Sequence, residues 1–218
     1  MKKIVFETVS RYDVFDEPVQ ISIPFREGSL LRKDVKNAVI LDNLGRSLPA
    51  QFTPTAVYND ESIKFLHCVF LANFPKNSPT IFHFDFNLNK QQEKFTPVTV
   101  EYLDKSKLIV SNGKLTIRLS SGNESPILSI DSPNLKLDRN NLDGIRLYDQ
   151  NKKPFEFKVD EKGWEVVDSG PIRVILRGKG YHRDNHNSTW FSGVLTITLF
   201  AHSSYITFDH QVINSVKS

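Results

Sequence analysis

The chain has 218 residues, of which 28 are Lys or Arg and 25 are Asp or Glu, so its formal net charge is +3 at pH 7. Charges of both signs are interspersed, and the concentrated basic stripe typical of nucleic-acid-binding proteins is missing from the sequence. Cys68 is the single cysteine, which excludes an internal disulfide and a Cys-x-x-Cys metal site. No run of 18 apolar residues occurs, so the sequence contains no candidate membrane-spanning helix.

The types of apolar residue favour strands over helices. The chain contains 16 Phe but only 1 Met, and aromatic and β-branched residues favour strands, whereas Ala, Leu and Met favour helices. Apolar and polar residues alternate with a period of two, in chain order, over residues 82–88, 115–119, 172–176, 195–199 and 206–212. Turn signals separate the strands: Glu27-Gly28, Asn43–Gly45, Asn59-Asp60, Lys162-Gly163 and Asp184-Asn185. Residues 31–39 offer one or two helical turns, so we predict an all-β chain built as a sandwich or barrel.

A polar stretch without periodicity divides the pattern. Residues 87–97 (NLNKQQEKFTP) end in a proline and predict a boundary between a first domain, residues 1–90, and a second, residues 98–218. The last strand pattern reaches Ile213 with no closing element behind it, which predicts a piece of a longer protein.

The N-terminus begins like a secretory signal and does not continue as one. Lys2-Lys3 imitates the positive start of a signal peptide, but Glu7, Arg11 and Asp13 interrupt the apolar run that should follow. We therefore expect a cytoplasmic chain, with a trimmed secretory leader as the alternative.

Three segments of the first domain, read in order, resemble one family. They are residues 18–28 (PVQISIPFREG), 42–51 (DNLGRSLPAQ) and 56–66 (AVYNDESIKFL), and the family is the exo-rhamnogalacturonan lyase-like (YetA-like) group. The second domain has weaker similarities at residues 110–115, 168–173 and 208–214. The resemblance implies an N-terminal RIFT-type β-barrel followed by an antiparallel β-sandwich. It places the catalytic region beyond this chain, so we carry over no catalytic residue.

The third of these segments shows what the motif does physically. Asp60 and Ser62 can bond nearby backbone N–H groups and fix a tight hairpin. Ile63 and Phe65 would then enter a strand buried on both faces, although Tyr58 and Phe65, which replace the family's tryptophans, could instead form an exposed stacking platform. Glu61 stands where the family has glycine, the residue that usually supplies a positive φ, so Asn59-Asp60 is the alternative site for the turn.

The candidate binding residues are aromatic and lie in the second domain. Trp164, Tyr181 and Trp190 are expected near strand ends, where exposed rings could stack on sugars. Arg183 beside them could pair with a uronate carboxylate. The competing interpretation is that the aromatic residues are core and that Arg183 is solvated.

The histidines and the cysteine suggest no chemistry. His182 and His186 have the i, i+4 spacing of a helical zinc pair, but the residues between them predict a hairpin loop. We expect His210 to be a buried, hydrogen-bonded structural residue, with a general base as the alternative, and Cys68 to be a buried, inert thiol. We therefore predict no metal site and no cofactor.

These observations predict a non-catalytic β-region of a polysaccharide lyase-like, pectin-related protein, with a structural or carbohydrate-binding role. Its expected partners are an oligo- or polysaccharide and the missing C-terminal catalytic region, with no nucleic acid and no membrane. Two alternatives remain open. One is a free-standing carbohydrate-binding module, and the other is a structural domain whose β-edges dock on a protein partner.

Overall fold

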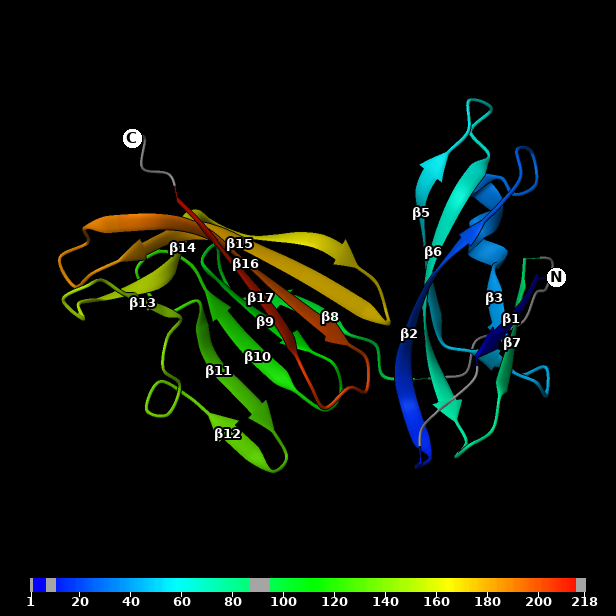
Figure 1. Ribbon diagram of the computed structural model, residues 1–218, viewed down its shortest axis with the longest axis horizontal. Helices are drawn as coiled ribbons and strands as arrows, with labels where there is room; N and C mark the ends of the chain where they lie inside the picture. The colour runs from blue at the N-terminus through cyan, green and yellow to red at the C-terminus, as the bar shows by residue number, and fades with distance from the viewer. Residues whose placement is uncertain (1, 7–10, 87–94, 215–218) are drawn as a thin grey trace. The chain divides into compact units, whose positions relative to one another are not determined.

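The structure of the chain is a computed structural model that describes residues 2–6, 11–86 and 95–214. Throughout these ranges the regular elements are antiparallel strands and one short 3-10 helix (Figure 1), which confirms the predicted all-β class. None of the described residues belongs to a helix that is long and apolar enough to cross a membrane. The chain divides into two compact units, Met1–Thr96 and Pro97–Ser218. Most of the polar stretch expected to mark a boundary, residues 87–94, lies outside the described residues.

The first unit is a small barrel-like fold made of two antiparallel sheets. The three-stranded sheet has the order β2 (Val14–Pro24), β6 (Ile63–Phe74), β5 (Ala50–Val57). The four-stranded sheet has the order β1 (Lys2–Phe6), β7 (Thr80–Asp85), β3 (Val39–Leu41), β4 (Ser47–Leu48). The 3-10 helix η1 spans Arg32–Asn37, within the segment that predicted one or two helical turns.

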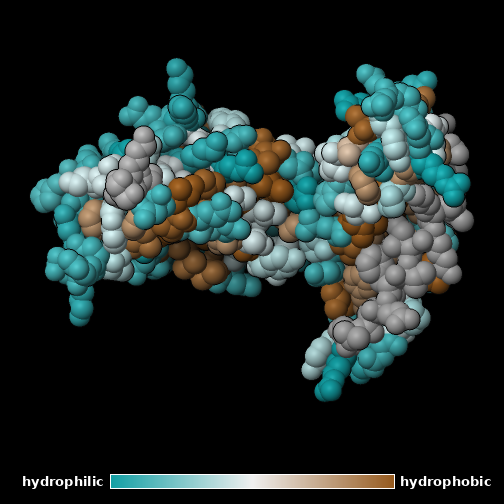
Figure 2. Space-filling model, turned by 45° about the horizontal axis from the view of Figure 1, so that its top comes forward, coloured by the Kyte–Doolittle hydropathy of each residue, from teal (hydrophilic) through white to brown (hydrophobic). Residues whose placement is uncertain are grey.

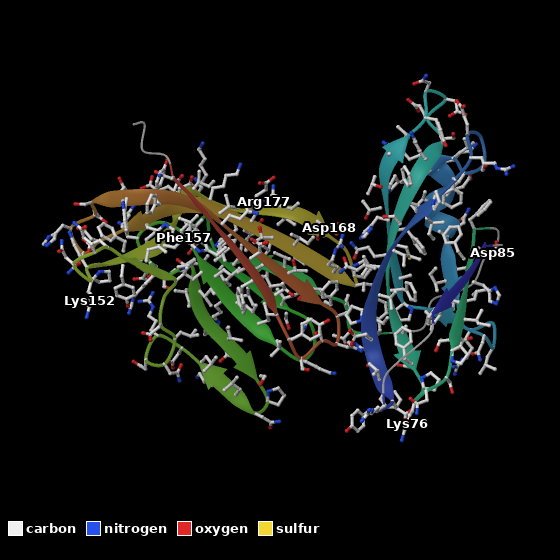
Figure 3. All side chains as sticks on the ribbon, in the orientation of Figure 1. Lys76, Asp85, Lys152, Phe157, Asp168 and Arg177 are labelled. Carbon is white, nitrogen blue, oxygen red and sulfur yellow. The ribbon has the colours of Figure 1, made fainter. Side chains whose placement is uncertain are left out.

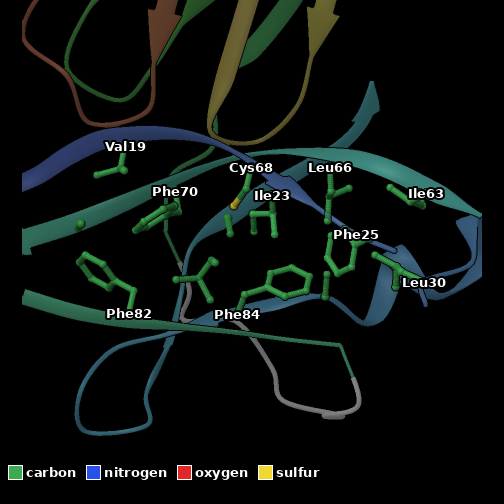
Figure 4. Packing of buried hydrophobic residues seen from close by; sticks show 14 residues of the cluster. Val19, Ile23, Phe25, Leu30, Ile63, Leu66, Cys68, Phe70, Phe82 and Phe84 are labelled. Carbon is green, nitrogen blue, oxygen red and sulfur yellow. The ribbon is translucent and has the colours of Figure 1, made fainter. Parts of the chain in front are cut away.

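Phenylalanine rings fill the core of this unit. Phe70 on β6 meets Phe82 on β7 at 5.1 Å between ring centroids, and Phe84 meets Phe25 at 5.6 Å, both edge to face (Figure 4). Edge-to-face contact places the positive rim of one ring against the negative face of the other. Cys68 lies in the same core with no exposed surface, and this burial raises the pKa of its thiol well above the ordinary value.

Phe65 does not follow the expectation that both faces of its strand are buried. Ile63, Leu66 and Cys68 are fully buried, but 39% of Phe65 is exposed. The pairing of β5 with β6 shifts register on both sides of Ala56, the partner of Phe65. Because a register shift interrupts the alternation of side chains between the faces of a sheet, Phe65 leaves the core that its neighbours enter.

The second unit is an antiparallel sandwich of two five-stranded sheets. One has the order β12 (Leu135–Leu137), β11 (Ile127–Ser132), β10 (Thr116–Ser120), β9 (Lys107–Ser111), β8 (Thr99–Tyr102). The other has the order β13 (Arg146–Tyr148), β14 (Pro154–Ser169), β15 (Arg173–Arg183), β16 (Thr189–Phe200), β17 (Thr207–Ile213). Buried apolar residues such as Ile117, Leu119, Leu176 and Leu195 form its core.

Strand β14 corrects one predicted turn. Lys162-Gly163 was expected to separate two strands, but both residues lie inside β14. The register with β15 shifts between Val159 and Trp164, and Gly163 has a φ of 80°. The glycine therefore serves a bulge within a continuous strand, a conformation that residues with a Cβ adopt at a cost.

The surfaces of both units mix polar and apolar residues. Figure 2 shows hydrophobic patches among a mainly hydrophilic surface on the face that it draws. Strand β17 contributes Phe208, Val212 and Ile213, each more than two-fifths exposed.

Candidate functional site

Two hairpin loops at one end of the second unit have the same backbone. The β13–β14 loop runs from Asp149 to Lys153 and the β15–β16 loop from Asp184 to Ser188. In each loop the backbone N–H of the first residue donates to the carbonyl oxygen of the fifth residue at 3.1 Å, from Asp149 to Lys153 and from Asp184 to Ser188. The fourth residue is left-handed, with φ of 63° at Lys152 (labelled in Figure 3) and 61° at Asn187. This is the three-residue hairpin in which a type I turn is followed by a left-handed residue.

The first aspartate holds each loop in this shape. Oδ1 of Asp149 accepts the N–H groups of Asn151 and Lys153 at 2.8 and 2.9 Å. Oδ1 of Asp184 accepts the N–H groups of His186 and Ser188 at 2.9 and 2.8 Å. Because a short carboxylate can satisfy turn N–H groups that have no strand partner, aspartate suits both positions.

An aromatic residue follows each aspartate six positions later. Phe155 follows Asp149, Trp190 follows Asp184, and their ring centroids are 5.0 Å apart. The two loops lie at the same end of the sheet because the first residues of β14 pair with the last residues of β15, as in Glu156 with Arg183. Two segments that are distant along the chain therefore place a pair of rings side by side.

These loops and rings form an open cleft of about 430 Å³. Its lining residues are Asp149, Gln150, Phe155, Ser188, Thr189 and Trp190. Half-buried Trp190 and Phe155, which is only 9% exposed, supply its apolar surface, and the loops supply a carboxylate, an amide and two hydroxyl groups. Such a set can hold a small ligand that has both apolar C–H surface and hydrogen-bonding groups.

An ion pair connects the two loops. Nζ of Lys153 lies 2.5 Å from Oδ2 of Asp184, whose side chain is fully buried. Lys153 lowers the pKa of Asp184 to about 2, and hydrogen bonds from the loop N–H groups contribute further. The Lys153 ammonium also lies 5.3 Å from the ring centroid of Phe155, so it fixes the loops next to the cleft.

The four residues proposed from sequence are dispersed. Trp190 lines the cleft and is half-buried, and its ring is tilted against that of Phe191 at 4.4 Å between centroids. Trp164 is 7% exposed, and its indole N–H donates to the Ser120 carbonyl at 2.9 Å. Tyr181 and Arg183 flank the buried His182 on β15, so they lie on the opposite, outer face of the sheet. Among the four, only Trp190 lines this cleft.

Sequence analysis missed the other five lining residues. The aspartate–aromatic spacing at Asp149…Phe155 and Asp184…Trp190 was a readable signal for them. It carries meaning only once β14 and β15 are known to be neighbours, because a single hairpin supplies one ring and half of the polar groups.

A buried histidine, His182, and a half-buried one, His210, lie on the inner face of the same sheet, so His210 is less buried than the sequence predicted. The rings of His182 on β15 and His210 on β17 are 5.1 Å apart between centroids, and Phe157 contacts both. Nδ1 of His182 lies 3.2 Å from the Phe191 carbonyl oxygen. In the part of the chain that the structure describes, neither Nε2 atom has a hydrogen-bond partner, so the expectation of a hydrogen bond fails at Nε2 of His210. Burial lowers the pKa of both rings, and His182 further lowers that of His210.

The His182–His186 spacing does not form a metal site. His182 is buried on a strand, whereas His186 is exposed in the following loop. Within the described ranges, no three His, Cys, Asp or Glu residues are grouped so as to hold a metal ion.

Comparisons with known proteins add little to this geometry. No protein-family model matches the sequence, and no curated protein matches it. Among solved structures, the chain is similar to a protein in the glycosyl hydrolase family 38 from Enterococcus faecalis, with 11% identity and a TM-score of 0.44. The match covers 99% of this chain and 31% of that chain, so this chain spans less than a third of that protein. Similarity at this level assigns neither fold nor function.

Proposed function

We propose that this chain is a carbohydrate-binding β-protein that holds a short stretch of glycan in the cleft at Phe155 and Trp190. One observation carries the proposal, namely the pair of aromatic rings beside a carboxylate, an amide and two hydroxyl groups in one open cleft. Sugars present apolar C–H patches next to hydroxyl groups. They therefore match surfaces that combine flat rings with hydrogen-bond donors and acceptors.

Binding to the purified chain tests this proposal. A glycan array identifies ligands, and titration of intrinsic fluorescence measures their affinity. The two tryptophans make fluorescence informative because Trp164 is buried and Trp190 lines the cleft. We expect a ligand to change the Trp190 emission and Trp190→Ala to abolish binding while leaving the chain folded.

Tyr181→Ala is the matched control for an aromatic residue outside the cleft. Tyr181 is 42% exposed and lies on the outer face of the sheet, so its removal should leave affinity unchanged. The proposal fails if no glycan binds, if Trp190→Ala binds normally, or if Tyr181→Ala is the variant that loses binding.

The more specific assignment, a non-catalytic region of an exo-rhamnogalacturonan lyase-like protein, is a second candidate. It is supported by the contact between two segments that carry the resemblance, where the Gly28 N–H donates to the Ser62 hydroxyl at 2.9 Å. The Asp42–Arg46 segment supports it less. Its turn has the geometry of the Asp149 and Asp184 loops, so local physics accounts for that motif. Rhamnogalacturonan oligosaccharides should bind without cleavage under this assignment, and an ultraviolet assay for unsaturated products would reveal turnover.

A further inference from the structure

The charge on the cleft lining is negative, with no positive group among the lining residues. Asp149 is the single ionisable residue among the six that line it. Its Oδ1 already accepts two loop N–H groups, whereas its Oδ2 accepts no hydrogen bond from the described residues. A ligand in the cleft therefore meets one carboxylate oxygen with unused acceptor capacity.

No cation in the two loops offsets this charge inside the cleft. Lys153, which packs on Phe155, is held by Asp184. Lys152 is exposed and is not among the lining residues. Arg183, the residue that could have paired with a uronate, lies on the outer face of β15.

We propose that the cleft selects neutral sugars over uronic acids, with Oδ2 of Asp149 accepting hydrogen bonds from sugar hydroxyl groups. This inference rests on the proposed carbohydrate-binding function and specifies its ligand class. Hydroxyl groups donate well to an ionised carboxylate, and such charge-assisted bonds are stronger than neutral ones. A uronate would instead bring a second negative charge toward Asp149, and no cation lines the cleft to compensate for its desolvation.

Matched ligand pairs test the selection directly. Each pair is a neutral methyl glycoside and its uronic acid: glucose with glucuronate, galactose with galacturonate, and mannose with mannuronate. Affinities come from chemical-shift titration and Trp190 fluorescence at low salt. We expect neutral members to bind on the order of tenfold more tightly than their uronates, and this ratio to shrink in about 1 M salt, where the Debye length is about 3 Å.

Asp149→Asn isolates the charge from the loop structure. The amide oxygen of asparagine can accept the same two loop N–H groups, so the hairpin should keep its shape. The variant should weaken binding of neutral sugars and strengthen binding of uronates, bringing the ratio near one. Asp143→Asn is the control, because its side chain is 96% exposed outside the cleft lining and the change in net charge is identical.

The outcomes separate the two proposals. If neutral sugars bind through Trp190 but uronates bind as tightly or more tightly, the neutral selection is wrong and the carbohydrate-binding function stands. The selection also fails if Asp149→Asn leaves the ratio unchanged or if Asp143→Asn changes it equally. If no sugar of any pair and no glycan on the array binds, the proposed function itself fails and this inference fails with it.

Discussion

The Ser62 hydroxyl joins two turns of the first unit that are 34 residues apart. It accepts the Gly28 N–H at 2.9 Å and donates to Oδ1 of Asp60 at 2.6 Å. Ser62 has no exposed surface, and Oδ1 of Asp60 also accepts its backbone N–H at 2.9 Å. One small side chain thus satisfies a turn N–H and orients the carboxylate that shapes its own hairpin.

Replacing Ser62 with alanine should destabilise the first unit by about 1–3 kcal/mol, because the buried hydroxyl no longer accepts the Gly28 N–H or donates to the Asp60 carboxylate. Ser29→Ala, an exposed change in the neighbouring turn, should change stability by less than about 0.5 kcal/mol. Urea denaturation of both variants measures the difference. Equal stability of the two would show that the Ser62 contact contributes nothing.

Glu61 adopts a φ of 62° where glycine would be unstrained. Glu61→Gly should therefore stabilise the chain by about 0.5–1 kcal/mol, because relief of a left-handed side chain exceeds the added entropy of the unfolded state. Gly45, at φ 74°, is the fourth residue of the loop 42–46, as Glu61 is of the loop 58–62. Gly45→Ala should therefore cost about 1 kcal/mol. Thermal unfolding measures both changes, and a destabilising Glu61→Gly would contradict the argument.

Asn112 links the β9–β10 turn to the loop after β16. Its amide donates to the carbonyls of Phe200 and Ser203 at 2.8 and 2.9 Å, while its Oδ1 accepts two turn N–H groups. Asn112→Ala should cost the second unit about 2–4 kcal/mol, since several buried polar groups lose their partners. The exposed Asn140→Ala serves as the control, and a cost below about 1 kcal/mol at Asn112 would refute the role.

The histidine pair should make the second unit sensitive to mild acid. Both rings have a pKa below the ordinary value of 6.5, so below that pH the unfolded chain binds protons that the folded chain excludes. The contribution of the two neutral rings to the free energy of unfolding should be complete above about pH 6.5. It should fall on acidification, by at most about 1.4 kcal/mol per pH unit for each ring.

The test compares wild type with His210→Phe by denaturant unfolding between pH 5 and pH 7.5. The variant should show a shallower pH dependence, because one of the two coupled rings no longer titrates. Parallel curves for the two proteins would show that His210 is not a source of the acid sensitivity.

Asp184 should contribute a separate loss of stability at lower pH. Its pKa is lowered to about 2 from an ordinary value of 3.8, so its stabilising effect is complete above about pH 4 and is lost as the pH falls toward 2. Lys153→Met removes the cation that is the largest cause of the lowered pKa. The variant should unfold more easily at pH 7 and should lose less additional stability between pH 4 and pH 2, as measured by denaturation midpoints.

Local patterns predicted the strands of both units more reliably than the exposure of single residues. Alternation at Ile117 and Leu119 placed both side chains in the core of the sandwich, where both are fully buried. The same reasoning placed Phe65 in the core of the first unit and was wrong, because the register shift beside Ala56 depends on how β5 meets β6. At Glu61, the resemblance indicated a position where glycine would supply a positive φ, with Asn59-Asp60 as the alternative, and the structure shows that glutamate itself adopts a φ of 62°.

The sequence by itself determined the all-β class, the short helical turn near residues 31–39 and the turns at residues 43–45, 59–60 and 184–185, since these follow from side-chain period and local hydrogen bonding. Only the tertiary structure decided which aromatic residues line the cleft. Trp164 is covered where its indole meets Ser120, whereas Trp190 meets Phe155 beside an open cleft. A period of two tells which residues share a face of one strand, but not which strands become neighbours or where the covering sheet ends. The cleft exists because antiparallel pairing of β14 with β15 brings the loops of Asp149 and Asp184 to one end of the sheet.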